Sequence, residues 1–355
     1  MVLINLVKRN KILILLPLVY AIGICVYIPP PDYDLVRFYH FYSVFRDFEL
    51  SSLEVQNLFR KRVDYISPIW LLFIAKAGLP MVCFLFPITH ITVFNFLYVF
   101  RSYYQNIRNK VPPNRTYFIV FCAISIPAVF SGVRNIHALS FVALALVLIR
   151  KNNKRWALVC LLYAGLFHYS TYLYLLVYGF YLLFNRLEVK KYGIKYQMAT
   201  CLIISGLTLL IKVTPSTYLE TLLPYGLFLK LDFYLKETDI LVREFLLNNR
   251  KYVVLNILYS YELLFLFVIL LFRKIRINVY WGLIFIPCIL TLFYPNIFSR
   301  YAMLVNIAIT MFVLTKKMSL IKKKILIVNV LFIFVIQFFL FLNYIMKFQN
   351  VQKLF

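Results

Sequence analysis

Short clusters of lysine and arginine occupy alternate gaps between the apolar segments of this chain. Residues 29–65 carry five basic and six acidic side chains, and residues 214–251 carry five of each. Lysine and arginine accumulate on the side of a membrane that is not translocated. We therefore expect the clusters to face the cytoplasm and the two long balanced stretches to lie outside. The clusters hold 23 of the 39 basic residues and lie at residues 8–11, 101–115, 150–155, 186–195, 273–276 and 316–324.

The apolar content of the chain decides between a soluble fold and a membrane fold. Hydrophobic residues make up 63% of the sequence and the mean hydropathy is +0.82, whereas soluble domains are about 45–50% apolar. The apolar runs are continuous, without the alternation of strands, and backbone groups in a bilayer must bond within helices or a closed barrel. The sequence therefore predicts an all-α, polytopic integral membrane protein with a single transmembrane domain over residues 1–355.

The charge pattern is satisfied by about eleven crossings, within a range of about 10–12 helices of about 20 residues each. The first apolar segment is interpreted as a span because no small-residue cleavage site follows it. The basic cluster at residues 8–11 places its N-terminal end in the cytoplasm. Residues 71–100 are too long for one span, so we expect a re-entrant or interfacial half-helix at 67–79, ended by Gly78 and Pro80. The expected crossings are residues 12–28, 81–100, 116–130, 136–149, two within 156–184, 197–213, 252–272, 277–293, 301–315 and 325–346.

Several common classes of binding site find no support in the sequence. The net charge of +26 is dispersed over short loops, whereas a nucleic-acid-binding protein gathers its basic residues on one face. The six cysteines each lie alone in an apolar run, and no Cys-x-x-Cys pair indicates a disulfide or a zinc site. The sequence also contains no P-loop and no His-Glu-x-x-His motif. We expect no nucleic-acid partner, no metal and no other cofactor.

Few charged side chains remain within or beside the apolar segments, and such charges usually face a cavity or a partner because they are costly in a membrane. Arg134 and Arg300 lie in short turns that the charge pattern places on the outer side. His168 lies at the outer tip of the helical hairpin expected over residues 156–184. A guanidinium fork matches phosphate oxygens, so paired arginines suit a pyrophosphate. A nearby histidine can take or give a proton near neutral pH.

Simpler roles remain open for the same residues. An interfacial arginine often anchors a lipid headgroup, and a single histidine at a helix tip is often a hydrogen-bonded structural residue. His137, three residues after Arg134, fits either packing or a site. Glu262 is the only acid within an expected span. This scarcity of intramembrane carboxylates disfavours a transporter coupled to protons or sodium.

One of two notable segments on the predicted outer side, residues 129–139, reads V-F-S-G-V-R-N-I-H-A-L. This segment is similar to the R-Q-x-x-A segment of the EpsG-type branch of the Wzy polysaccharide polymerases. Asn135 stands where the family usually has glutamine, and His137 stands where an aliphatic residue is usual. Residues 164–170 read A-G-L-F-H-Y-S and resemble the family's A-x-x-F-H-x-S element at about the expected distance.

Two further features carry the same resemblance. Asp34, Phe38 and Tyr42 follow the first span and resemble the family's D-x-x-x-Y-x-x-x-Y element, with phenylalanine in place of the first tyrosine. Arg300, before a late span, is similar to an arginine found there in the family. The resemblance covers residues 20–185 well and the remainder in its general plan.

The resemblance implies a membrane glycosyltransferase of GT-C-like architecture in the bacterial inner membrane. Wzy-type enzymes transfer a growing glycan from undecaprenyl pyrophosphate to another lipid-linked repeat unit on the outer face, making O-antigen, capsule or exopolysaccharide without a metal. Membrane lipids and a chain-length regulator are the further implied partners. The residues implied are His168 and Asp34 as candidate bases, Arg134, Arg300, Asn135 and Arg243 as pyrophosphate ligands, and His137 and Ser170 in support.

Two other functions share these sequence features. A flippase or transporter for lipid-linked oligosaccharides would bind the same substrate in a basic cavity but needs no residue for proton transfer. Another membrane transferase, such as an O-antigen ligase or an acyltransferase, would share the outer site and differ in its acceptor.

Overall fold

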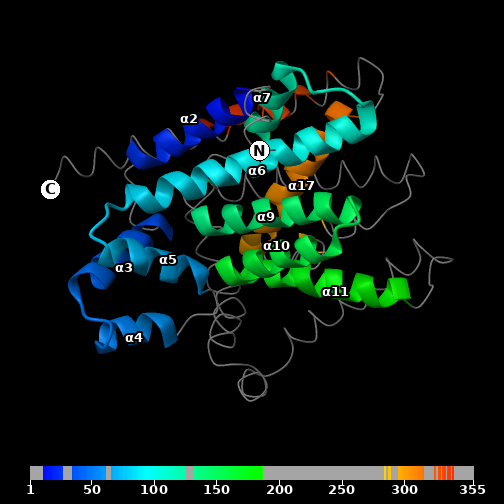
Figure 1. The fold of residues 1–355 in the computed structure, drawn as a ribbon. Coiled ribbons are helices and arrows are strands. Elements are labelled where there is room, and N and C mark those ends of the chain that lie inside the picture. The colour runs from blue at the N-terminus through cyan, green and yellow to red at the C-terminus, as the bar shows by residue number, and fades with distance from the viewer. Residues whose placement is uncertain are drawn as a thin grey trace. The chain divides into compact units, whose positions relative to one another are not determined.

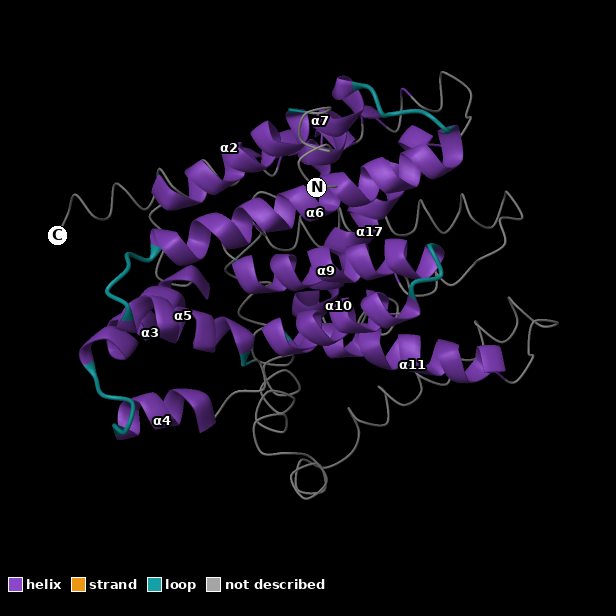
Figure 2. Ribbon diagram, in the orientation of Figure 1, coloured by secondary structure: helices purple, strands orange, loops and turns teal. Residues whose placement is uncertain are grey.

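The computed structural model describes residues 11–26, 34–60, 65–124, 132–186 and 295–315, together with scattered positions at 129 and between 284 and 339. These residues form helices and connecting turns, with no strand among them (Figure 2). The prediction of an all-α protein is confirmed for this part of the chain. The chain divides into two compact units, the first containing residues 1–59, 64–171 and 307–355 and the second containing residues 60–63 and 172–306.

The core of the first unit is a row of four packed helices (Figure 1), in which α6 contacts α2 on one side and α9 on the other, and α10 packs on α9. In chain order these helices are α2 (Ile12–Val26), α6 (Val82–Arg108), α9 (Val133–Arg150) and α10 (Lys154–Phe167). Ala138 and Ala145 of α9 are fully buried, as are Ala157 and Ala164 of α10. Small residues let helix backbones approach closely, which drives helix association where lipid replaces water.

Two of these helices, α6 and α9, are long and apolar enough to cross a membrane by their length and composition. Three shorter apolar helices accompany them, at Ile12–Cys25, Ile66–Lys76 and Tyr301–Phe312. The predicted crossings at 197–213 and 252–272 lie outside the described residues. The total of about 10–12 transmembrane helices therefore stays a prediction.

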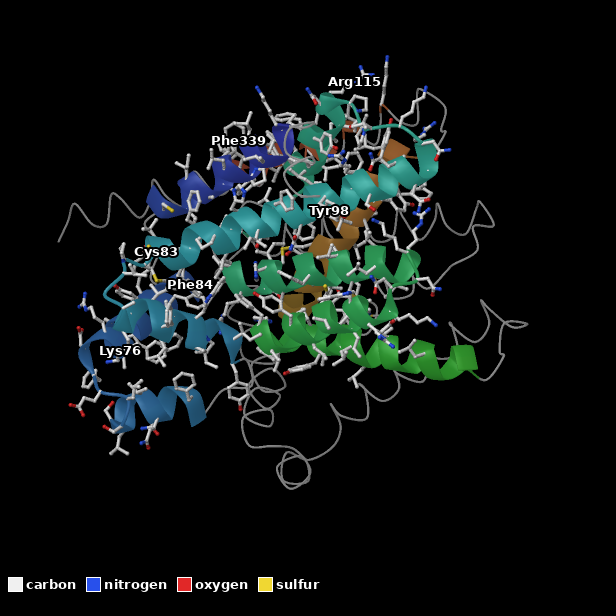
Figure 3. All side chains as sticks on the ribbon, viewed as in Figure 1. Lys76, Cys83, Phe84, Tyr98, Arg115 and Phe339 are labelled. Carbon is white, nitrogen blue, oxygen red and sulfur yellow. The ribbon has the colours of Figure 1, made fainter. Side chains whose placement is uncertain are left out.

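The predicted interruption before the crossing at 81–100 is confirmed as a break between two helices. Helix α5 (Ile66–Lys76) ends before Gly78, whose φ of 67° lies in the left-handed region that glycine adopts at no steric cost, and α6 starts at Val82. Phe84, labelled in Figure 3, is fully buried at the start of α6, and its ring lies 5.4 Å from Phe38 and 6.2 Å from Trp70. The position of α5 relative to the membrane stays a prediction.

Helix α6 ends later than the sequence predicted. It continues through the basic segment at residues 101–108 and stops at Asn109, whose left-handed φ of 53° closes the helix with an N–H bond to Gln105 O. Arginine ends an apolar run but is a good helix former, so the end of hydrophobicity did not mark the end of the helix. The cytoplasmic loop expected at 101–115 is correspondingly shorter, and α7 (Asn114–Ala123) follows it.

Two other helices begin earlier than predicted, and they include three candidate residues that we expected before the helices. Helix α9 begins at Val133, and α17 (Pro295–Thr315) begins at Pro295. Arg134, Asn135 and Arg300 therefore lie in helices, and their assignment to turns was wrong. The residues before each apolar run are compatible with helical backbone even though they are polar.

The first long stretch, residues 29–65, contains two helices, α3 (Asp34–Asp47) and α4 (Leu53–Arg60). Helix α3 packs on α5, and the rings of Phe45 and Phe59 stack at 5.7 Å between α3 and α4. The stretch predicted to lie outside the membrane is therefore a folded element that reaches the helical core.

The second unit is described over α11 (Tyr172–Arg186) and the first part of α17. Its fully buried Tyr174 lies 5.5 Å from the buried ring of Tyr301 in an edge-to-face contact. Offset and edge-to-face arrangements are the favoured geometries of aromatic pairs.

Candidate functional site

His168 lies at a break in the helical path, as the sequence predicted. It ends α10 with an extended backbone (φ −150°, ψ 117°), and the 3₁₀ turn η1 (Tyr169–Thr171) follows it. The His168 N–H donates to Ala164 O at 2.9 Å, and the Thr171 hydroxyl donates back to His168 O at 2.9 Å. The side chain is 2% exposed. The backbone on both sides of His168 is thus hydrogen-bonded, and its ring has a defined position inside the protein.

The His168 ring is joined to the first turn of α9 through Ser170. His168 Nδ1 lies 2.7 Å from Ser170 Oγ, and the Ser170 hydroxyl donates to Asn135 Oδ1 at 3.0 Å. Ser170 and Asn135 are buried with it. The structure therefore brings together three residues that the sequence singled out, His168, Ser170 and Asn135. The ring of Tyr169 stacks beside His168 at 4.8 Å.

Arg134 precedes Asn135 in the same helical turn and contacts the first long polar stretch, residues 29–65. Its guanidinium carbon lies 4.9 Å from the ring centroid of Phe38 on α3, a cation–π distance. Phe38 is 1% exposed. The first turn of a helix also carries the positive end of the helix dipole, which favours anions. Arg134 therefore combines a formal positive charge with the positive potential at the start of α9.

The comparison with known families decides what kind of protein carries this arrangement. The sequence model of the EpsG family matches residues 7–354. The chain belongs to the EpsG family. Searches of curated proteins and of solved structures gave no match. EpsG proteins are Wzy-type polysaccharide polymerases, so the resemblance drawn from residues 20–185 is confirmed and extends over nearly the whole chain. The chain is accordingly a membrane protein with a role related to polysaccharide polymerisation.

His137 occupies the position where an aliphatic residue is usual in EpsG proteins, and it lies in a buried network. Nδ1 is 2.8 Å from Thr92 Oγ1 and 3.2 Å from Ile88 O, while Nε2 is 3.1 Å from the Tyr163 hydroxyl. The Thr92 hydroxyl donates to Ile88 O, so it accepts from Nδ1, and Nε2 accepts from Tyr163. His137 is completely buried and joins α6, α9 and α10. These contacts favour a structural role for His137, in which its ring holds the three helices together.

The D-x-x-x-Y-x-x-x-Y element of the EpsG resemblance lies on α3, where residues four apart share a face. Asp34 is the first residue of α3, and its side chain lies outside the description. Tyr42, two turns later, donates its hydroxyl to Leu79 O at 2.7 Å. Beyond it, the exposed Arg46 guanidinium bonds Asp47 at 2.7 Å and holds the pKa of that carboxyl below its usual range. Exposed ion pairs contribute little to stability.

The remaining predicted EpsG site residues are not placed beside His168. Arg300 lies in α17 with its side chain outside the description, and Arg243 lies outside the described residues. Among the residues that the structure does describe, no group of three or more His, Cys, Asp or Glu side chains is arranged to hold a metal ion.

Sequence reasoning did not connect Phe38 with Arg134, or Tyr163 and Thr92 with His137. The spacing of Asp34, Phe38 and Tyr42 by four residues was a signal for a helix that presents Phe38 on one face. No comparable signal marks Tyr163, the one hydroxyl side chain of α10. Thr92 follows Thr89 and precedes Asn95 by three residues each on α6, a spacing that places these polar side chains on one helix face.

Proposed function

We propose that this EpsG protein polymerises undecaprenyl-pyrophosphate-linked oligosaccharide repeat units by glycosyl transfer on the outer face of the bacterial inner membrane. The observation that supports the proposal is the hydrogen-bonded connection between His168 and the first turn of α9. Ser170 links His168 to Asn135 over two hydrogen bonds of 2.7 and 3.0 Å, and Arg134 directly precedes Asn135 in that turn. A proton acceptor and a phosphate-binding cation thus belong to one local structure.

The reaction needs both groups. A hydroxyl of the acceptor repeat unit attacks the anomeric carbon of the donor glycan, forming a new C–O bond. The C–O bond to the pyrophosphate breaks, and its electron pair leaves with undecaprenyl pyrophosphate. The hydroxyl proton passes to a general base. A positioned base contributes about 10²–10⁴-fold to such a rate.

Arg134 suits the leaving group because a guanidinium neutralises charge where it develops on phosphate oxygens. Its position in the first turn of α9 adds the dipole of that helix. Arg300 and Arg243 are proposed, from the sequence, as further ligands of the pyrophosphate. With several arginines on the pyrophosphate, the proposed transfer is metal-independent.

His168 is the first choice for the base, and Asp34 is the second. The ring of His168 is buried at 2% exposure, and a site without water strengthens its interactions with the charged reaction centre. The proposal further places the N-terminus in the cytoplasm, in agreement with the charge pattern of the sequence. It also includes a chain-length regulator as a partner, which the EpsG resemblance implies.

The test replaces His168 in a strain that depends on this chain for its polymer. His168→Gln keeps a hydrogen-bonding side chain but cannot carry the proton, so we expect long chains to disappear while single lipid-linked repeats accumulate on the outer face. His40→Gln is the matched control, because His40 is an exposed histidine on α3. Chain-length ladders and the sidedness of the single repeats are the measurements.

One result would contradict the assignment of the base, and another would contradict the proposed activity. Normal chain lengths in His168→Gln would remove His168 as the base and direct attention to Asp34. Single repeats trapped on the cytoplasmic face in the deletion strain would instead identify a flippase for lipid-linked oligosaccharides.

A further inference from the structure

We infer that Ser170 and Asn135 form a relay that holds the His168 proton on Nδ1, so that the lone pair on Nε2 is the basic position of the ring. The inference rests on the proposed function, in which His168 accepts the proton of the acceptor hydroxyl. Ser170 and Asn135 then act through His168 as positioning residues. This role for Asn135 differs from the pyrophosphate contact expected from the sequence.

The direction of the relay follows from counting protons. The Ser170 hydroxyl has one proton, which it donates to Asn135 Oδ1 at 3.0 Å. Its oxygen can therefore only accept in the 2.7 Å contact with His168 Nδ1. That contact is a hydrogen bond only if Nδ1 carries the proton. The neutral ring then has its lone pair on Nε2.

The opposite tautomer fits the distances less well. With an unprotonated Nδ1, the Ser170 hydroxyl would donate to the ring, and the lone pairs of Ser170 Oγ and Asn135 Oδ1 would face each other at 3.0 Å. The backbone N–H of Ser170 lies 3.3 Å from Nδ1 and would favour that tautomer. The 2.7 Å contact is a hydrogen bond in either tautomer, so the choice lies between the 3.0 Å bond to Asn135 Oδ1 and the 3.3 Å contact of the backbone N–H. The bond to Asn135 is the stronger of the two, because hydrogen bonds weaken with distance beyond about 3 Å.

The arrangement also accounts for how the charged ring is stabilised after it takes the proton. A protonated ring donates from both nitrogens, and the donor on Nδ1 already has Ser170 Oγ as its acceptor. Asn135 lies in the first turn of α9 and is buried at 4% exposure. The acceptor chain is therefore fixed by α9, which carries Asn135, and by the turn η1, which carries Ser170, and it needs no rearrangement during transfer.

The direct test is the tautomer itself, measured by ¹⁵N NMR of histidine-labelled protein in lipid nanodiscs at a pH where the ring is neutral. The chain has only four histidines, and the spectrum of His168→Gln assigns the His168 signals. We expect a protonated Nδ1 in the native protein and in Asn135→Asp, which keeps the acceptor oxygen. We expect an Nε2–H population in Ser170→Ala and Asn135→Leu, where the acceptor chain is broken.

The second arm measures transfer with the lipid-linked repeats extracted from a strain that lacks this gene. Ser170→Ala and Asn135→Leu should lower kcat by roughly 10–100-fold, the effect of one hydrogen bond to a charged group, with KM little changed. Ser170→Thr keeps the hydroxyl and should restore part of the rate. Ser140→Ala is the matched control, because Ser140 is a fully buried serine of α9 that bonds Asn95 instead.

The outcomes separate the relay from the proposed function. An unprotonated Nδ1 in the native protein, or unchanged kcat in both Ser170→Ala and Asn135→Leu, overturns the relay while His168 stays the base. The NMR arm requires no turnover, so it reports on the relay even if another residue is the base. Polymer formation by His168→Gln overturns the proposed base, and with it the positioning role of Ser170 and Asn135.

Discussion

The guanidinium carbon of Arg134 on α9 lies 4.9 Å from the ring centroid of Phe38 on α3. Phe38 is buried at 1% exposure and also packs 5.4 Å from Phe84 of α6. The contact therefore connects a helix of the first long polar stretch with the first turn of α9. The guanidinium that we propose binds a lipid pyrophosphate thus contacts an aromatic side chain from a different part of the chain.

Replacement of Phe38 should weaken the proposed pyrophosphate site. We expect Phe38→Leu to raise the KM for lipid-linked repeats by roughly 2- to 30-fold, because a cation–π contact is worth about 0.5–2 kcal/mol. Phe38→Tyr, which restores the residue usual at this position in the resembling element, should stay near normal. Phe45→Leu is the control, since Phe45 is equally buried on α3 and stacks on Phe59. Equal losses in Phe38→Leu and Phe45→Leu would assign the effect to α3 stability.

The two arginines should not tolerate lysine. Arg134→Lys and Arg300→Lys keep the charge but lose the planar fork that bonds phosphate oxygens in pairs. We expect each variant to lose most of its polymer at a normal protein level, measured by chain-length ladders and immunoblots. Lys76→Gln should change little, because Lys76 bonds the backbone oxygen of Phe48 outside the proposed site. Unchanged ladders in both arginine variants would make these residues headgroup anchors.

His137 should behave as a packing residue. Tyr163→Phe removes the hydroxyl 3.1 Å from His137 Nε2 and leaves a buried acceptor unsatisfied, at a cost of about 1–3 kcal/mol. We expect a lower melting temperature in detergent and less protein, with polymer per molecule preserved. Tyr65→Phe, at an exposed tyrosine, should alter neither. A loss of transfer without a loss of stability would place His137 in the site.

The sidedness of the loops can be read by labelling single cysteines with a reagent that does not cross the membrane. In a background without native cysteines, which include the exposed Cys83, Ser51→Cys should be labelled on intact cells and Asn153→Cys only after lysis. Both positions are exposed in the fold, so protein burial does not protect them. External labelling at residue 153 would reverse the assignment of the basic clusters and with it the side of His168.

The helical class and the main interruptions of the helices were predictable from the sequence, because both depend on local composition. Continuous apolar runs leave helices as the way to satisfy the backbone in a bilayer, and Gly78 and His168 mark breaks that the structure places at the same points. Helix ends were less predictable. A polar residue such as arginine limits an apolar run without limiting the helix. Arg134 and Arg300, which the sequence placed in turns, therefore lie within α9 and α17 in the structure.

The sequence by itself determined that this is an α-helical membrane protein of the EpsG family, and it singled out Arg134, Asn135, His168 and Ser170. Only the tertiary structure decided which of them meet. Asn135 and Ser170 are 35 positions apart, and Phe38 reaches Arg134 from another helix. A helix that is apolar on all faces does not encode which face its few polar residues turn to a neighbour. That choice comes from the packing of α9 against α6 and α10, and from the contacts of α3 with α9 and α6.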